Sequence, residues 1–369
     1  MPNRLVERLD AEIALADDPF VRECLKARRA AALARQGLFS DARFALAGLR
    51  SQSARLRRPL LFSWVALVEG QIEHCESLAD SARGRFAQAR QLAIDAQDDA
   101  MQGECAAWLA VSDFNANEPD AMALHAREAL TLAPADGHVA RARASLVVAD
   151  ALRYAGEDDA AQPWYAQVRR HAMAEGDVSL VSMLLHNVAA FRAGRIALDD
   201  ALGRADIADA QRVLMEAEST SNYDAGVGHG QLLTMVPLLR AQMLVVLGRF
   251  EEAVSVIDAQ LARAREEGQT RRVALFLADA AYCEVRMERE KEALRRLRQL
   301  QPLLARVLEP DDQAAMHARL AVVTRALGRA AAADQHAAAA AEALARYEAE
   351  QQRWLAALAP VREACTPVG

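Results

Sequence analysis

Apolar residues recur along most of the chain at spacings of three and four, in stretches separated by short polar turns. Residues 235–247 are mostly apolar, as expected of a helix that is buried on more than one side. After the next turn, Ala253, Ile257 and Leu261 recur at four-residue spacing and give a second helix one apolar stripe. β-Branched runs are short and no Asn-Gly pair occurs, so the pattern predicts helices and no strands.

The turn between these two helices, residues 247–253, has the composition of a helix end followed by a helix start. Gly248 can adopt the left-handed conformation that ends a helix without a steric cost. Two glutamates follow, at positions where negative charge stabilises a helix N-terminus. Ala241, twelve residues before Ala253, is small enough for two antiparallel helices to approach closely. The stretch therefore predicts a helical hairpin.

Partial copies of this turn recur about every 40 residues, which indicates a repeat of helical hairpins. Met287–Ala293 lacks the glycine but keeps the small residue Ala281 twelve positions earlier. Asn, the next-best left-handed residue, replaces glycine at Asn117. The other copies are marked by Gly37, Gly156 and Gly328, and a further repeat by Gly70, Ala82, Phe86 and Ala89.

The copies predict one all-α domain over residues 1–369. An N-terminal helix occupies residues 1–17, repeats one to five occupy 18–202, an irregular insertion or loop occupies 203–230, repeats six to eight with a long last helix occupy 231–359, and a tail occupies 360–369. The ends of a helical-repeat domain must cover an exposed apolar edge. The last helix is therefore predicted to cap the domain, and the alternative is that it forms a homodimer contact.

These residues resemble the tetratricopeptide repeat (TPR), in which two antiparallel helices carry small residues at their crossing points. The match covers residues 18–340, although the period is longer than the usual 34 residues. The resemblance implies a right-handed α-solenoid of about eight hairpins that binds a protein or peptide on its concave face. The matching positions are Gly70, Ala82, Phe86, Ala89, Ala110, Ala129, Pro134, Ala241, Gly248 and Ala253.

The long period and the segment 218–228 are also similar to the N-terminal sensory regions of some bacterial diguanylate cyclases. Those proteins continue into a GGDEF catalytic domain, and no such motif is present in this sequence. The similarity implies a regulatory module that acts on a separate effector.

Composition narrows the class of partner. The net charge is −7, whereas a nucleic-acid-binding surface needs a basic stripe, so no nucleic acid is expected. No run of 18 apolar residues occurs, so no membrane span is expected. The five scattered cysteines fit reduced thiols in a cytoplasm better than a disulfide framework. Nearly all basic residues are arginine, as expected of a GC-rich bacterial genome.

The sequence contains no motif for catalysis, a metal or a cofactor, and we expect none of the three. No HExxH, CxxC or Gly-x-Ser-x-Gly pattern occurs, and His186 has no ligand partner at helical spacing. The glycine-rich stretch 226–230 precedes a helix, where a phosphate could bind. No strand precedes it and no Lys-Ser or Lys-Thr pair follows, so it is interpreted as a loop or hinge.

The resemblance implies that the first helix of each repeat lines the concave face. The residues there are polar and aromatic, which suits the amides and carboxylates of a peptide. Arg143 and Arg153 are the best candidates for an anionic group. The alternative is a solvated face with internal pairs such as Arg153 with Asp150. The candidate groove residues are Trp64, Gln71, His74, Glu104, Phe114, Asn115, Arg143, Asp150, Arg153, Tyr154, Gln242, Tyr282, Arg286 and Arg325.

Two functions follow from these observations. The first is a non-catalytic protein- or peptide-binding scaffold or regulator in a bacterial cytoplasm. The second is a sensor that binds a small signal molecule or signalling peptide and regulates a separate effector by a change of curvature.

Overall fold

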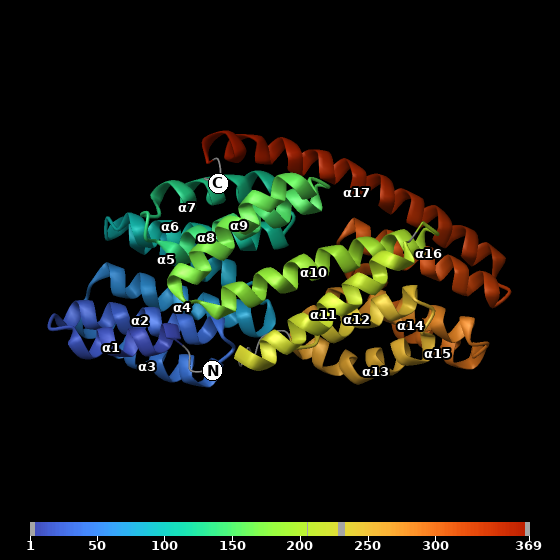
Figure 1. Cartoon of the computed structure of the whole chain (residues 1–369), viewed down its shortest axis with the longest axis horizontal. Helices are drawn as coiled ribbons and strands as arrows, with labels where there is room; N and C mark the ends of the chain where they lie inside the picture. The colour runs from blue at the N-terminus through green and yellow to red at the C-terminus, as the bar shows by residue number, and fades with distance from the viewer. Residues whose placement is uncertain (1–3, 205, 228–232, 366–369) are drawn as a thin grey trace. The chain divides into compact units, whose positions relative to one another are not determined.

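The structure is a computed structural model that describes residues 4–204, 206–227 and 233–365, with the side chains of 218–227 outside the description. Within these residues the chain is all-helical, with 17 α-helices, two short 3₁₀ turns and no strand (Figure 1). The all-α class predicted from the sequence is confirmed. The glycine-rich stretch 226–230, predicted to be a loop or hinge, lies almost wholly outside the described residues.

Contacts within the chain divide it into two compact units. Unit 1 comprises residues 1–185, 224–231 and 352–369, and unit 2 comprises residues 186–223 and 232–351. Helices α10 (Val178–Ala201), α11 (Ile207–Val227) and α17 (Ala330–Ala364) contribute residues to both units.

Unit 1 is built from helices that pack in sequential pairs, α2 with α3, α4 with α5, α6 with α7, and α8 with α9. The first helices of successive pairs also contact one another, α2 with α4, α4 with α6 and α6 with α8. The helices are α1 (Arg4–Leu15), α2 (Pro19–Arg35), α3 (Phe39–Leu56), α4 (Pro59–Ser77), α5 (Ala82–Asp95), α6 (Asp99–Asn115), α7 (Pro119–Leu132), α8 (His138–Tyr154) and α9 (Asp158–Glu175).

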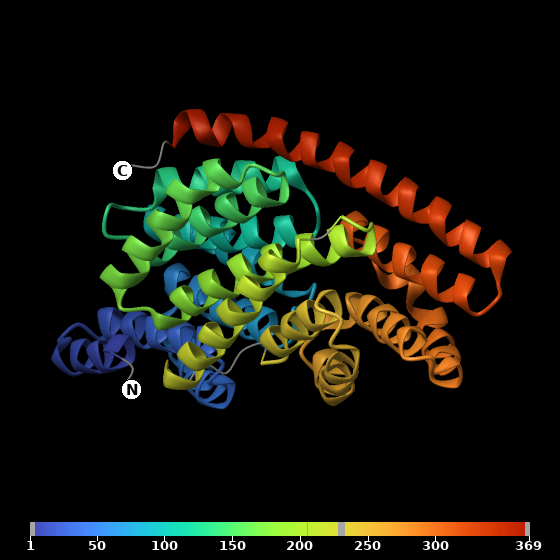
Figure 2. The same cartoon turned by 45° about the vertical axis from the view of Figure 1, so that its right-hand side comes forward.

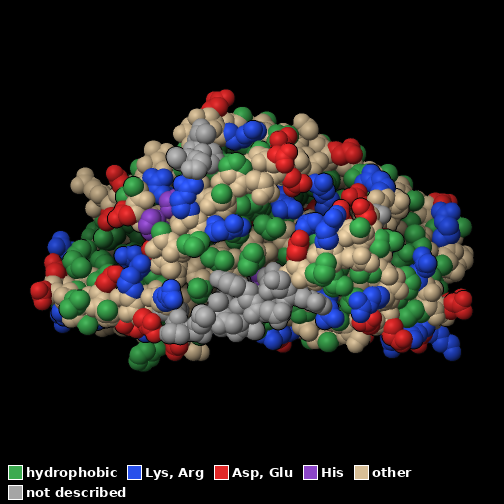
Figure 3. All heavy atoms as spheres, in the orientation of Figure 1, with side chains coloured by type: hydrophobic (Ala, Val, Ile, Leu, Met, Phe, Trp, Pro, Cys, Tyr) green, Lys and Arg blue, Asp and Glu red, His purple; other side chains and the backbone are tan. Residues whose placement is uncertain are grey.

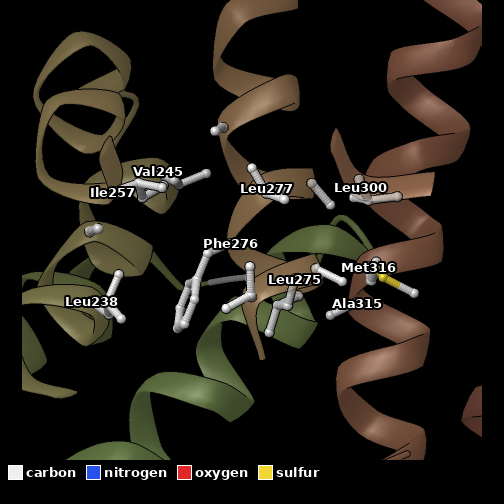
Figure 4. Packing of buried hydrophobic residues seen from close by; sticks show 14 of the residues in the cluster. Leu238, Val245, Ile257, Leu275, Phe276, Leu277, Leu300, Ala315 and Met316 are labelled. Carbon is white, nitrogen blue, oxygen red and sulfur yellow. The ribbon is translucent and has the colours of Figure 1, made fainter. Parts of the chain in front are cut away.

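Unit 2 repeats the pairing, with α12 against α13 and α14 against α15. Figure 4 shows its core, where Leu238, Ile257, Phe276 and Met316 converge from four different helices. The helices are α12 (Met235–Val246), α13 (Phe250–Glu266), α14 (Val273–Arg286), α15 (Glu290–Leu300) and α16 (Pro310–Ala326), with 3₁₀ turns η1 (Gln269–Arg271) and η2 (Gln301–Arg306).

The predicted turn chemistry is present in both units. Gly248 has φ +71° and ends α12 in the left-handed conformation. Asn117 adopts the same conformation with φ +58°, and Glu288 does so with φ +59° in the copy that lacks glycine. Gly70 is required for a different reason, because a Cβ there would lie 2.6 Å from the Phe86 ring. The repeated turns therefore fix the helix boundaries.

The segment predicted to be irregular, residues 203–230, contains the 21-residue helix α11. Its apolar positions Ala210, Val213 and Ala217 follow helical spacing and are all buried. The nearby Ser- and Gly-rich composition concealed this periodicity. The last helix also extends beyond the predicted residue 359 to Ala364, so half of the predicted tail is helical.

Candidate functional site

In unit 1, ion pairs join residues that are far apart in the sequence. Glu175, at the end of α9, accepts hydrogen bonds from Arg8 at 2.9 Å and from Arg28 at 3.3 Å. Arg35, at the end of α2, binds Asp177 through Nε at 3.0 Å and Nη2 at 2.8 Å. These pairs link the first two helices of the unit to the corner between α9 and α10.

Asp177 is held in place by the helix that it precedes. Its carboxylate accepts a hydrogen bond from the Ser179 backbone N–H at 3.1 Å, as an N-terminal capping residue does. The Arg35 guanidinium and the Ser179 hydroxyl lower the pKa of Asp177 and outweigh the opposing effect of burial. Both side chains of the Arg35–Asp177 pair are almost fully buried, so removal of either would leave an uncompensated charge.

Beside these pairs lies a cavity of about 360 Å³, near the lower end of the usual size range of small-ligand sites. Its walls come from α1, α2, α4, α6, the connection between α7 and α8, and the end of α9. The polar and aromatic side chains in the wall are Arg28, Arg35, Trp64, Asp98, Glu104, Asp136, His138 and Glu175.

Glu104 is one of the acidic residues in this wall. It lies on α6, lines the cavity, and accepts no hydrogen bond from any described residue. Burial raises the pKa of its carboxyl group, and the positive charges of Arg35 and Arg28 oppose that shift. Trp64 forms an aromatic part of the same wall. The sequence had predicted both Trp64 and Glu104 on the inner surface.

Arg143, predicted as an anion-binding residue, is buried with 1% of its surface exposed. Its guanidinium lies 3.6 Å from the centroid of the Trp108 ring, and its Nη1 faces the Met183 sulfur at 3.8 Å. Its Nε and Nη2 atoms have no acceptor among the described residues. Burial lowers the pKa of Arg143 to about 10, because the charged form lacks solvent.

Other polar atoms beside Arg143 are also unsatisfied. The amide oxygen and nitrogen of Gln71, and Nε1 of Trp108, have no partner among the described residues. The His74 ring lies 5.5 Å from the Trp108 ring, and burial together with Arg143 lowers the pKa of His74 to about 4. Buried polar groups of this kind cost folding free energy and call for an explanation. We name Gln71, His74, Trp108 and Arg143 the inner polar cluster.

A second set of predicted groove residues in unit 1 is covered by the chain itself. Trp354, near the end of α17, lies 5.3 Å from the Phe114 ring and 6.2 Å from the Tyr154 ring. Its Nε1 donates to Asn117 Oδ1 at 3.0 Å. Figures 1 and 2 place the last turns of α17 beside α7, and burial of Leu358 and Val361 agrees with this packing. The last turns of α17 therefore cap this end of unit 1.

The remaining candidates on α6 and α8 make local contacts. Asn115 is exposed on the last turn of α6. Asp150 accepts a hydrogen bond from the Tyr165 hydroxyl at 2.9 Å, and Arg153 pairs with Asp158 at 3.3 Å. The partner of Arg153 in this pair is therefore Asp158, and not the Asp150 that its position three residues away had suggested.

The candidates in unit 2 lie on three helices. Gln242 on α12 is buried with both amide atoms unsatisfied. Arg286 donates to the Tyr282 hydroxyl at 3.0 Å, both on α14. Arg325 on α16 is exposed and pairs with Asp334 at 2.7 Å. The fourteen candidates are therefore divided between the two units, ten of them in unit 1 and four in unit 2.

Unit 2 also contains a buried arginine that the sequence did not indicate. Arg319 on α16 pairs with Asp279 of α14 at 3.2 Å and with Asp200 of α10. Its guanidinium lies 4.3 Å from the centroid of the Tyr282 ring. Unlike Arg143, it has two carboxylate partners, and their charges raise its pKa despite burial.

The residues missed in unit 1 are Arg28, Arg35, Glu175 and Asp177. One local signal existed, because Gly176-Asp177 ends one helix and precedes another, where an aspartate caps the N-terminus. No sequence spacing could show that Arg35 lies beside Asp177, since 142 residues separate them. The arginines on α2 had the appearance of an ordinary solvated helix face.

Histidines and cysteines form no cluster of metal ligands. The rings of His138 and His171 face each other with Nδ1 atoms 3.0 Å apart, and those of His317 and His336 at 2.9 Å. Among the described side chains, no group of three or more His, Cys, Asp or Glu residues is arranged to hold a metal ion. All five cysteines are free thiols, in agreement with the prediction of no disulfide framework.

Every helix within the described ranges is too short or too polar to cross a lipid bilayer. No protein-family model matches the chain, and no curated protein is significantly similar to it in sequence.

Proposed function

We propose that this protein is a non-catalytic regulatory module that binds a small signal molecule or short peptide inside unit 1. The observation that carries the proposal is the cavity of about 360 Å³, whose wall includes Glu104, Arg28 and Trp64. Concave sites with a few converging polar groups are the usual places of ligand binding. The helical-hairpin pattern fits a TPR-like right-handed solenoid, a fold in which binding on the inner surface can change curvature.

A small ligand is favoured over a long partner lying along the inner surface. The pairs of Arg8 and Arg28 with Glu175, and of Arg35 with Asp177, cross that surface. A long extended chain would have to displace them, and removal of a buried partner costs about 3–5 kcal/mol. A ligand of a few residues or fewer fits the cavity without breaking the buried Arg35–Asp177 pair.

We expect no nucleic acid as a partner. On the face seen in Figure 3, arginine and acidic side chains are interspersed, and neither sign forms a continuous stripe. The net charge of −7 adds to this expectation.

Ligand capture from defined mixtures tests the proposal. The protein is incubated with pools of amino acids, short peptides, nucleotides and metabolites, separated by rapid gel filtration, and retained compounds are identified by mass spectrometry. A ligand that binds only the native state also raises the melting temperature. Retention of at least one compound is expected, and retention of none from any pool would overturn the proposal.

A variant that fills the mouth of the cavity localises the binding. Ala100 lines the cavity at the exposed start of α6, so Ala100→Trp adds bulk there with little effect on folding. The matched control is Ala330→Trp, at the exposed start of α17 in unit 2. The proposal expects Ala100→Trp to abolish retention and Ala330→Trp to preserve it.

A further inference from the structure

The charges inside unit 1 identify a ligand class. We infer that the cavity takes a small zwitterion, an amino acid or a short peptide with both ends free, whose ammonium group binds Glu104 and whose carboxylate binds Arg28. The inference rests on the proposed function, because it names the ligand of the same cavity. The inference uses Glu104 and Arg28, which line one cavity and can each form further hydrogen bonds.

Glu104 supplies the anionic half of the recognition. Its carboxylate faces the cavity, and none of its oxygens accepts a hydrogen bond from a described residue. A carboxylate has about four acceptor sites, and an ammonium group has three donors to fill them. An ammonium group in the cavity could therefore donate to the Glu104 carboxylate.

Arg28 supplies the cationic half. Its Nη2 makes one long contact, 3.3 Å to Glu175, and Glu175 has a shorter contact of 2.9 Å with Arg8. A guanidinium carries five donors and binds a carboxylate in a bidentate geometry. A ligand carboxylate can therefore bind Arg28 while Arg8 continues to neutralise Glu175.

Neither charge alone fits this cavity. A simple anion such as phosphate would meet the Glu104 carboxylate, and a simple cation would meet Arg28 and Arg35. Burial raises the pKa of Glu104, and the positive charges of Arg35 and Arg28 oppose that shift. A zwitterion can place its ammonium group at Glu104 and its carboxylate at Arg28, so that each charge meets an opposite one. Trp64 in the same wall offers an aromatic surface to the body of the ligand.

The size of the cavity limits the length of the zwitterion. A volume of about 360 Å³ is near the lower end of ligand sites, which favours a single amino acid or a very short peptide. Both sources carry the same two charged groups. The experiment therefore uses separate arms for the twenty amino acids and for a pool of dipeptides.

Each pool is offered in three forms, unmodified, N-acetylated and C-amidated, and retention on the protein is measured by mass spectrometry. Acetylation removes the ammonium group and amidation removes the carboxylate. We expect each change to lower retention at least 10-fold. Equal retention of the three forms would overturn the inference.

Two substitutions test which residue binds the ammonium group of the ligand and which binds its carboxylate. Glu104→Gln should bind the unmodified form less tightly and no longer distinguish it from the acetylated form. Arg28→Met should no longer distinguish the acid from the amide. The controls are Glu118→Gln, exposed before α7, and Arg29→Met, whose side chain pairs with Asp10 at 2.6 Å. Both controls should keep the wild-type preference, and a preference that persists in Glu104→Gln or Arg28→Met contradicts the assignment.

The outcomes separate this inference from the proposed function. If neither zwitterion pool is retained but another compound is, and Ala100→Trp abolishes its retention, the ligand class is wrong and the binding function stands. If nothing is retained from any pool, the function itself fails. Circular dichroism of each variant confirms folding before its binding is interpreted.

Discussion

Each unit holds a buried arginine, and the two arginines differ in their partners. Arg143 in unit 1 and Arg319 in unit 2 each lie over an aromatic ring of the preceding inner helix, Trp108 and Tyr282 respectively. Arg319 binds two carboxylates, whereas the Nε and Nη2 atoms of Arg143 have no acceptor among the described residues. Burial accordingly lowers the pKa of Arg143 to about 10, while that of Arg319 is raised by its partners.

This difference distinguishes buried charges that have partners in the fold from buried charges that do not. A buried charge with good partners is part of the fold, and its removal is costly. A buried charge without partners lowers stability, so its presence points to a role outside folding. Unit 1 also contains the cavity that Glu104 and Arg28 line. This cavity supports the proposal that ligand binding belongs to unit 1, whereas the paired charges around Arg319 fit a structural role in unit 2.

Arg319→Met should give the largest effect on stability. It leaves Asp279 and Asp200 without their cation, and breaking a buried pair from one side costs about 3–5 kcal/mol. Urea unfolding combined with hydrogen exchange of α14 and α16 measures the loss. A change below about 1 kcal/mol would show that the network of unit 2 is not structural, and would break the comparison.

Trp354→Ala tests whether the aromatic end of unit 1 is structural. Trp354 is buried against Phe114 and Tyr154 and donates to Asn117, so truncation should cost about 3 kcal/mol. Ligand retention should not change, because none of these residues lines the cavity. Loss of retention by a folded Trp354→Ala protein would extend the site to this aromatic cluster.

Arg143→Met should have a smaller effect of the opposite sign to Arg319→Met. The substitution removes a buried charge that lacks a partner and replaces it with an apolar side chain of similar length. We expect unchanged stability or a gain of up to about 2 kcal/mol, measured by the same urea unfolding. A loss comparable to that of Arg319→Met would mean that Arg143 is satisfied in solution, and would remove the contrast.

The pH dependence of stability should also differ between the two units. Burial lowers the pKa of His74 to about 4, so its contribution is complete above about pH 6.5 and is lost as the pH falls toward 4. Burial raises the pKa of Asp279 to about 6, more than Arg319 lowers it. Its contribution is complete below about pH 4 and is lost as the pH rises through 6.

Single substitutions separate these two contributions. His74→Gln should flatten the stability profile of unit 1 between about pH 6.5 and 4, and Asp279→Asn should flatten that of unit 2 between about pH 4 and 6. Site-resolved hydrogen exchange follows α4 for the first and α14 for the second. An unchanged slope in either variant contradicts the corresponding assignment.

Local features of the fold could be predicted from the sequence. Gly248 and Asn117 mark turns because the left-handed conformation is a property of single residues. Helix α11 was missed because Ser and Gly residues near its end resemble a loop, although Ala210, Val213 and Ala217 carried the helical spacing.

The candidate site could be predicted only in part. Trp64 and Glu104, which line the cavity, were among the candidates because the TPR resemblance implies that the first helix of each repeat carries the binding residues. Arg28 and Arg35 were not, because their partners Glu175 and Asp177 lie more than 140 residues away. No local pattern encodes such a pairing, since it depends on how successive hairpins stack.

Hydrogen exchange of the intact protein with and without a retained zwitterion tests the central claim most directly. Binding between Arg28 and Glu104 should slow backbone exchange in α2 and in the first half of α6. Exchange in α14 and α16 of unit 2 should stay the same. Slower exchange confined to α14 and α16, with α2 and α6 unchanged, would place the ligand on the paired network of Arg319 and contradict the assignment of binding to unit 1.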